Sequence, residues 1–190
     1  PYLVLDYASG GTVRQKYPKG TRIPLEQILH FLKQLADALQ YAHDQRIIHR
    51  DVKPENMFLD SNGEILLGDF SSVLLSHSSR LQSAQNIVGT AAYIAPEQIQ
   101  GKPKLASDQY ALGIVTYEWL TGERPFAGTF TEVIGQHMTT PPPPLVTKIP
   151  NLAPVIEQVV LKALAKDPQA RFSSIQTFAQ NFRSEEHTSE

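Results

Sequence analysis

The chain contains no cysteine among its 190 residues, which excludes disulfide bonds and cysteine-ligated metal sites. The histidines show no metal-ligand spacing either, and we expect them at the surface or in packing: His30, His43, His77 and His137. The absence of cysteine suits the reducing cytoplasm, which is the location we predict.

Excess positive charge is also absent, because 17 lysines and arginines stand against 19 aspartates and glutamates, a net charge of −2. This balance argues against a nucleic-acid partner. No apolar run approaches the about 20 residues that a membrane-spanning helix needs, so we expect no membrane segment in this chain. A membrane anchor of a longer parent protein would lie outside these residues.

Hydrophobic residues make up 41% of the sequence, enough for one globular core, and their spacing predicts a mainly helical domain. Apolar residues recur at helical intervals after Pro24 up to about Ile47, and again over 155–164 and 175–182. The run 107–120 is apolar on nearly every side, as expected of a buried helix.

Two short apolar runs, 57–60 and 64–67, flank the turn sequence S-N-G at 61–63 and predict a β-hairpin. Because a hairpin lays its two strands side by side, it would bring Asp69 back beside Asn56. The predicted fold class is therefore α+β and mainly α, with a small β-hairpin.

The segment 49–56, H-R-D-V-K-P-E-N, places a carboxylate, a cation and a carboxamide on one short loop. Phosphoryl transfer needs a carboxylate for the proton of the attacking hydroxyl, positive charge near the phosphate, and oxygen ligands for Mg²⁺. Asp51, Lys53 and Asn56 can supply these functions from one cleft. The segment matches H-R-D-x-x-x-x-N throughout and resembles the catalytic loop of protein kinases. Lys53 resembles the serine/threonine class rather than the tyrosine class.

The segment G-D-F-S at 68–71 resembles the metal-binding D-F-G segment of the same family. The resemblance makes Asp69 the principal Mg²⁺ ligand beside Asn56, and Phe70 a packing residue that positions Asp69. The third position is Ser71, and a side chain there disfavours backbone conformations that glycine tolerates. This departure keeps open a pseudokinase-like protein-interaction module as the alternative, against which the retained polar residues argue.

The serine-rich stretch that follows resembles an activation segment, which closes with A-P-E at 95–97. Thr90 matches the position that shapes the site for the acceptor hydroxyl in serine/threonine kinases. Arg50 supplies a cation that can pair with a phosphate added to this segment, although the sequence does not show which serine accepts it. The resemblance implies structural roles for four further residues: His49, Glu97 with its partner Arg171, and Asp108 as an anchor of the catalytic-loop backbone.

The first residues, Y-L-V-L-D-Y-A at 2–8, resemble the last strand of the small kinase lobe running into the hinge. Leu5 would then be the gatekeeper, and the backbone of Asp6 and Ala8 would face the adenine of ATP. Phe58 would form the apolar floor under the base. The alternative is an ordinary edge strand with a glycine turn, but the distance to the catalytic loop fits one long helix and favours the hinge.

The resemblance divides the chain into the end of the small lobe with the hinge, 1–11, and a large lobe, 12–182. It is most similar to the bacterial eukaryotic-like serine/threonine kinases. These residues contain neither the G-x-G-x-x-G loop nor the strand lysine that kinases carry before the hinge, so we expect that the N-terminal lobe is missing from this chain. We expect the parent to transfer the γ-phosphate of Mg-ATP to Ser/Thr hydroxyls of a protein substrate, and this chain alone to be inactive. Residues 183–190 resemble a translated sequencing adapter, and we expect a disordered, non-native tail.

Overall fold

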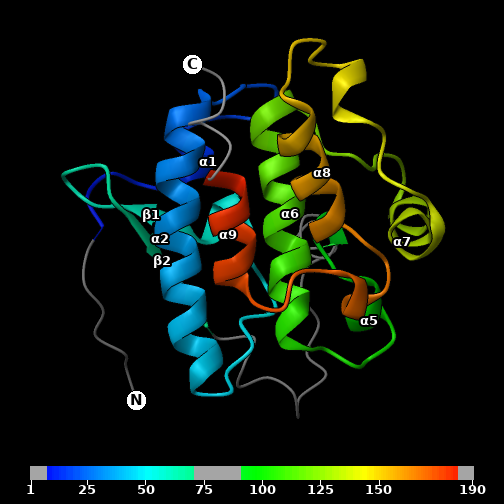
Figure 1. Ribbon diagram of the computed structural model, residues 1–190. Coiled ribbons are helices and arrows are strands. Elements are labelled where there is room, and N and C mark those ends of the chain that lie inside the picture. The colour runs from blue at the N-terminus through cyan, green and yellow to red at the C-terminus, as the bar shows by residue number, and fades with distance from the viewer. Residues whose placement is uncertain (1–7, 71–90, 184–190) are drawn as a thin grey trace.

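The computed structural model describes residues 8–70 and 91–183, in which helices pack around one central helix and a two-stranded sheet lies at one side (Figure 1). This arrangement confirms the predicted fold class. The elements are α1 (Val13–Lys16), α2 (Leu25–Asp44), β1 (Met57–Leu59), β2 (Ile65–Leu67), α5 (Pro96–Ile99), α6 (Leu105–Thr121), α7 (Phe130–Thr139), α8 (Pro154–Ala163) and α9 (Ile175–Arg183). Short 3-10 turns, η1 (Pro54–Asn56), η2 (Leu145–Thr147) and η3 (Pro168–Ala170), lie between them.

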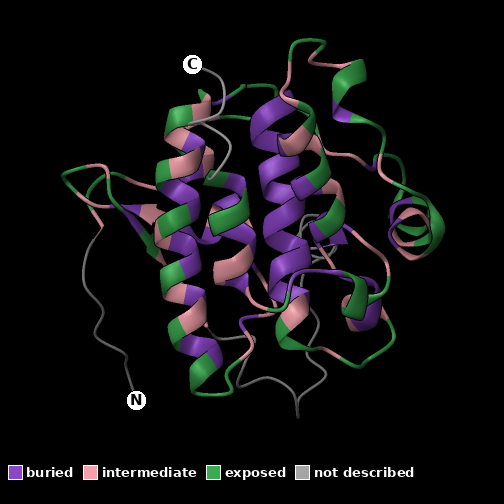
Figure 2. Cartoon of the chain, in the orientation of Figure 1, coloured by how far each residue is buried: buried purple, intermediate pink, exposed green. Residues whose placement is uncertain are grey.

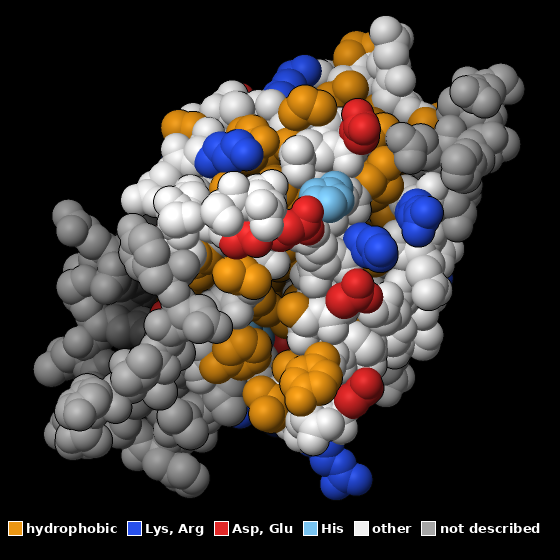
Figure 3. Space-filling view, turned by 90° about the vertical axis from the view of Figure 1, so that its left-hand side faces the viewer, with side chains coloured by type: hydrophobic (Ala, Val, Ile, Leu, Met, Phe, Trp, Pro, Cys, Tyr) orange, Lys and Arg blue, Asp and Glu red, His pale blue; other side chains and the backbone are white. Residues whose placement is uncertain are grey.

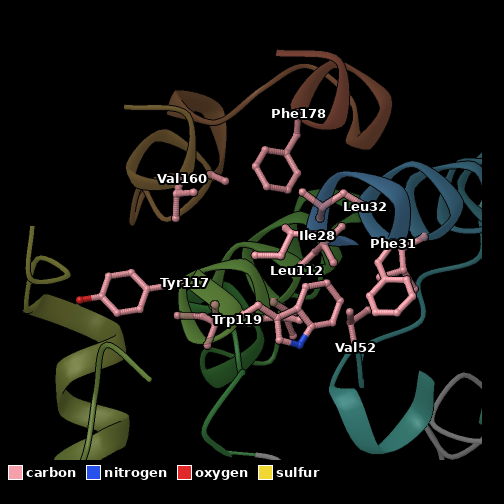
Figure 4. Packing of buried hydrophobic residues seen from close by; sticks show 14 of the residues in the cluster. Ile28, Phe31, Leu32, Val52, Leu112, Tyr117, Trp119, Val160 and Phe178 are labelled. Atoms are coloured by element: carbon pink, nitrogen blue, oxygen red, sulfur yellow. The ribbon is translucent and has the colours of Figure 1, made fainter. Parts of the chain in front are cut away.

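Helix α6 forms the centre of the core, as its apolar sequence predicts. Every residue from Ser107 to Thr121 is buried, on all faces of the helix (Figure 2). Helices α2, α8 and α9 pack against it, and their apolar side chains meet its own in the interior (Figure 4). Gly113 allows α8 to approach closely, because a Cβ there would lie 3.0 Å from the Leu164 side chain.

Helix α2 is the long amphipathic helix that the sequence predicts. One face is buried against the core, and the residues on it recur at intervals of three and four: Ile28, Phe31, Leu32, Leu35, Ala36 and Leu39. The helix ends at Asp44 rather than near Ile47. Arg46 is the physical reason, because its φ of 59° is left-handed and cannot continue a right-handed helix.

The predicted hairpin is confirmed. Strands β1 and β2 are antiparallel, with Met57 opposite Leu67. In the turn between them, the Asp60 carboxylate accepts a hydrogen bond from the backbone N–H of Asn62 at 2.7 Å. Gly63 takes a left-handed φ of 83°, which the absence of a side chain permits.

The segment before α1 runs alongside β1 and forms an isolated bridge to it, between Thr12 and Phe58. The Gly10 N–H donates to the Leu59 carbonyl at 2.8 Å, and the Leu59 N–H donates to the Gly11 carbonyl at 2.8 Å. Helix α1 then begins with a capping box, in which Thr12 and Gln15 bond to each other's backbone N–H. These contacts fix α1 against the hairpin.

Helices α1, α5 and α7 are not predicted from the sequence, because they have only four, four and ten residues and therefore show little periodicity. Helix α9 extends to Arg183, one residue past the predicted end of the large lobe, and 184–190 lie outside the described residues. Within the described ranges, every helix is too short or too polar to cross a bilayer. The face turned to the viewer in Figure 3 mixes acidic, basic and hydrophobic side chains, without a field of one sign.

Candidate active site

The side chain of Asp108, at the start of α6, binds the backbone of the catalytic loop. Its carboxylate accepts the backbone N–H of His49 at 2.9 Å and that of Arg50 at 2.8 Å. The ring Nε2 of His43, at the end of α2, lies 2.8 Å from the same carboxylate. Asp108 is 1% exposed, so these hydrogen bonds form away from solvent and join α2, α6 and the loop.

The loop is strained where Asp108 holds it. Arg50 has a φ of 69°, a conformation that costs a residue with a side chain about 1–2 kcal/mol. Such a conformation persists only when surrounding contacts impose it, and the hydrogen bond from the Arg50 N–H to Asp108 is one of them. The strained residue immediately precedes Asp51, so the anchor determines where the Asp51 carboxylate lies.

Asp51, Lys53 and Asn56 form one hydrogen-bonded group. Oδ2 of Asp51 accepts from Nζ of Lys53 at 2.7 Å and from Nδ2 of Asn56 at 3.0 Å. Nδ2 of Asn56 also donates to the Asp51 carbonyl at 2.8 Å, so the amide oxygen of Asn56 lies on the side away from Asp51. The side chains of Asp51 and Lys53 are 11% and 17% exposed, which leaves both within reach of a substrate.

The hairpin brings Asp69 to the same place. The N–H of Gly68 donates to the Asn56 carbonyl at 2.9 Å, so Asp69 directly follows the residue paired with Asn56. The His49 ring contacts this turn twice, because its Nε2 lies 2.9 Å from the Gly68 carbonyl and the ring makes a T-shaped contact with the Phe70 ring at 4.5 Å between centroids. Asp69 is exposed and has a φ of 60°, a second strained residue at the site.

Glu97 and Arg171 form a buried ion pair. Nη1 and Nη2 of Arg171 donate to the two carboxylate oxygens of Glu97 at 2.7 and 2.9 Å. Burial alone would raise the pKa of Glu97, but the hydrogen bonds from Arg171 and from the Ser107 hydroxyl outweigh it and lower that pKa. Arg171 also donates to the Ala106 carbonyl, so the pair joins α5, the start of α6 and the segment before α9.

Arg50 carries an unused donor. Its carbonyl accepts from Nε2 of Gln98 at 2.9 Å, which ties the catalytic loop to α5. Its Nε is buried and has no hydrogen-bond partner among the described residues. A buried guanidinium N–H without an acceptor is costly, and it suits an anion that approaches from outside these contacts.

The structure describes only some of the residues that are expected to contact ATP. Phe58 is half-buried on β1 and packs against Gly68, where a Cβ would lie 2.6 Å from the Phe58 ring. Ala8 is described and partly buried. The other predicted residues of the hinge and activation segment lie outside the described residues: Leu5, Asp6, Ser71 and Thr90.

The oxygen donors of Asn56 and Asp69 suit a Mg²⁺ ion that takes its other ligands from phosphate groups. The described residues contain no cluster of three or more His, Cys, Asp or Glu that could hold a metal ion by themselves. Mg²⁺ commonly takes one or two oxygen ligands from the protein and the rest from phosphate and water. Asn56 and Asp69 offer oxygen donors of this kind from neighbouring positions.

Two residues that contact the site, His43 and Arg14, have no role predicted from the sequence. His43 is expected to be a surface or packing residue, yet it contacts Asp108 from 65 positions away. Arg14 belongs to no motif, and its guanidinium reaches Glu55 of the catalytic loop at 2.9 Å. Both contacts are long-range and join single residues, so no spacing pattern in the sequence marks them.

Comparisons with known proteins agree with this geometry. A family model described as "Protein kinase domain" matches residues 1–183. The chain is 35% identical over 178 residues to a probable serine/threonine-protein kinase of Streptomyces coelicolor, covering 92% of this chain and 26% of that protein. It is 36% identical over 180 residues to serine/threonine-protein kinase PknA of Mycobacterium tuberculosis, covering 94% of this chain and 41% of that protein. It thus spans less than half of the length of these relatives, and it belongs to the protein kinase family.

Proposed function

We propose that the protein to which this chain belongs transfers the γ-phosphate of Mg-ATP to serine and threonine hydroxyls of a protein substrate. The observation that carries the proposal is the hydrogen-bonded group of Asp51, Lys53 and Asn56 on one loop anchored by Asp108. A carboxylate, a cation and a metal-type oxygen donor are the parts that phosphoryl transfer requires. The proposed location is the cytoplasm, where Mg-ATP is available.

Asp51 receives or orients the proton of the attacking hydroxyl. As the hydroxyl oxygen forms its bond to phosphorus, the proton passes toward the Asp51 carboxylate and the bond to the leaving phosphate oxygen breaks. Lys53, 2.7 Å from that carboxylate, is placed to neutralise charge on the transferring phosphate.

Asn56 and Asp69 are the proposed metal ligands. Bound Mg²⁺ would supply positive charge against the phosphate oxygens. The Gly68–Asn56 backbone hydrogen bond and the His49–Gly68 contact support this proposal, because they hold the backbone before Asp69 beside that of Asn56. Leu5, Asp6, Ala8 and Phe58 are the proposed adenine contacts.

Arg50 is proposed as the receiver of a regulatory phosphate. Its buried Nε has no acceptor among the described residues, and a phosphate offers charged oxygens for charge-assisted hydrogen bonds. The phosphate would be carried by a phosphorylated residue of the serine-rich segment, and its oxygens would accept from Arg50. Thr90 is proposed to shape the site for the acceptor hydroxyl.

The proposed division of the chain is hinge and end of the small lobe at 1–11, large lobe from 12 to the end of α9 at Arg183, and tail from 184. The alternative function, an interaction module without catalysis, depends on Ser71, which lies outside the described residues. The retained group around Asp51 and the nearby Asp69 speak against that alternative.

We further propose that these 190 residues alone do not catalyse phosphorylation. They contain no glycine-rich loop over the phosphates and no strand lysine. Loss of one preorganised contact of this type costs about 10²–10³-fold in rate, and several are missing together. Incubating the chain with Mg-ATP and a general protein substrate should give no phosphate incorporation above that of its Asp51→Asn variant. Turnover that depends on Asp51 would refute the proposed inactivity.

A further inference from the structure

Four consecutive prolines, 141–144, connect α7 to η2 at the outer edge of the molecule (Figure 1). Proline fixes its own φ at about −65°, and it restricts the residue before it to extended ψ values. At the two ends of the segment, Thr140 has φ −89° and ψ 125°, and Pro144 has φ −57° and ψ 134°. The segment is therefore a short polyproline II helix.

This helix is anchored at both ends. The Thr140 N–H donates to the Gln136 carbonyl in the last turn of α7 at 2.9 Å. Leu145, which directly follows the prolines, is 0% exposed, and the Thr147 hydroxyl donates to the Pro144 carbonyl at 2.6 Å. Because the rings and the anchors already fix its shape, the segment would lose little conformational freedom on binding a partner.

The polyproline II helix turns two of its three edges to solvent. It has three residues per turn, so residues three positions apart share an edge. Pro141 and Pro144 form one edge, and both are exposed. Thr140 and Pro143 form the second edge, and both are again exposed. Pro142, on the third edge, is partly buried, so this edge is the one turned toward the rest of the molecule.

The free edges offer apolar rings and hydrogen-bond acceptors. Among the described residues, no donor bonds to the carbonyls of Pro141, Pro142 or Pro143, and these residues have no N–H of their own. A partner strand cannot pair with them, because strand addition needs backbone N–H donors. Tyrosine and tryptophan suit this surface, since their rings pack on apolar groups while their O–H or N–H donates.

We propose that the exposed edges of the proline segment 141–144 are a docking site for a partner domain whose groove is lined by aromatic side chains. Grooves of this chemistry bind polyproline II segments in SH3, WW and EVH1 domains. The exposed apolar surface continues to Val146, which is 37% exposed. The inference goes beyond the proposed kinase function, because none of the residues assigned to phosphate transfer takes part in it. A spacer between two helices would need only the stiffness of the segment.

The test titrates the ¹⁵N-labelled 190-residue chain with one SH3, one WW and one EVH1 domain. Prolines have no amide proton, so the signals of Thr140, Leu145 and Val146 report on the segment. At least one domain should shift these signals saturably, with a Kd of about 0.1–1 mM for such a short contact. The same domain with its groove aromatics replaced by alanine should cause no shift.

Three single substitutions locate the contact. Pro144→Ala and Pro143→Ala each remove a ring from one exposed edge, and each should weaken binding about tenfold. Pro142→Ala is the matched control, because it removes a ring of the same helix from the partly buried edge, and its Kd should stay within about threefold. The Tm of each variant should lie within about 4 °C of the parent, so that weaker binding does not reflect unfolding.

Three results would overturn the inference. Absence of a saturable shift with all three domains would leave the segment as a spacer. Equal weakening by Pro142→Ala and Pro144→Ala would show that the exposed edges are not the contact surface. Shifts of the same signals that grow with the concentration of the chain alone would show that a second copy occupies the segment. None of these readouts requires phosphorylation, so failure of the proposed function is seen separately.

Discussion

Replacing Asp51 by asparagine is expected to lower kcat for protein phosphorylation by about 10³-fold, within the range for loss of a proton-accepting group. Asparagine keeps the shape of the side chain and an oxygen that can accept from Lys53, which lies 2.7 Å from Oδ2. Its amide oxygen cannot take up the proton of the attacking hydroxyl. The measurement is single-turnover phosphate transfer in a protein where a small lobe precedes these residues.

Asp37→Asn is the matched control for this substitution. Asp37 lies on the exposed face of α2, and its Oδ1 accepts from Gln176 at 2.6 Å, a bond that asparagine can also make. Its kcat should stay within about twofold of the parent, as for surface substitutions that disturb no contact. If Asp51→Asn kept more than a tenth of the parent activity, Asp51 would not be the residue that handles the proton.

Replacing Asp108 by alanine is expected to lower the free energy of unfolding by about 3–5 kcal/mol. The carboxylate is 1% exposed and accepts the backbone N–H groups of His49 and Arg50, with His43 as a third partner. Its loss leaves these donors buried without an acceptor, and it releases the strained φ of Arg50. Since domains of this kind are stable by only about 5–15 kcal/mol, urea titration should show a large fall in midpoint.

Two further substitutions distinguish the loss of the hydrogen bonds to Asp108 from the loss of a negative charge alone. Asp108→Asn keeps one acceptor oxygen and should lose about half as much as alanine. Asp44→Ala removes an exposed carboxylate that accepts from Gln40 at 2.8 Å, and it should cost less than about 0.5 kcal/mol. Equal stability of Asp108→Ala and Asp44→Ala would contradict the anchoring role of Asp108.

The larger elements of the fold could be predicted because their burial patterns are periodic. Helix α2 presents one apolar face and α6 is buried on all faces, and each pattern is visible in the residues themselves. The Asn-Gly turn likewise marks the hairpin. Helix ends and short helices are harder to predict, because they depend on single backbone conformations such as the left-handed Arg46 and on caps such as the Thr12 capping box.

The candidate site likewise has a part that can be predicted from the sequence and a part that cannot. The spacing of Asp51, Lys53 and Asn56 is local, so the sequence alone predicts that they share one loop. The contacts of Arg14 with Glu118 and of His43 with Asp108 join residues 104 and 65 positions apart. No local pattern encodes such pairs, because they are brought together by tertiary packing, of α1 against η1 and β1 and of α2 against α6.

Paramagnetic broadening of backbone amide signals by Mn²⁺ bound to a non-hydrolysable ATP analogue tests directly whether Asn56 and Asp69 share one metal–phosphate site. Mn²⁺ prefers the same oxygen ligands as Mg²⁺ and weakens the signals of nearby nuclei. In the isolated chain, the amide signals of 53–56 and 68–70 should weaken selectively, those of α7 and α9 should not, and Asp69→Asn should abolish the effect. Broadening centred elsewhere, or unchanged by Asp69→Asn, would contradict the shared site.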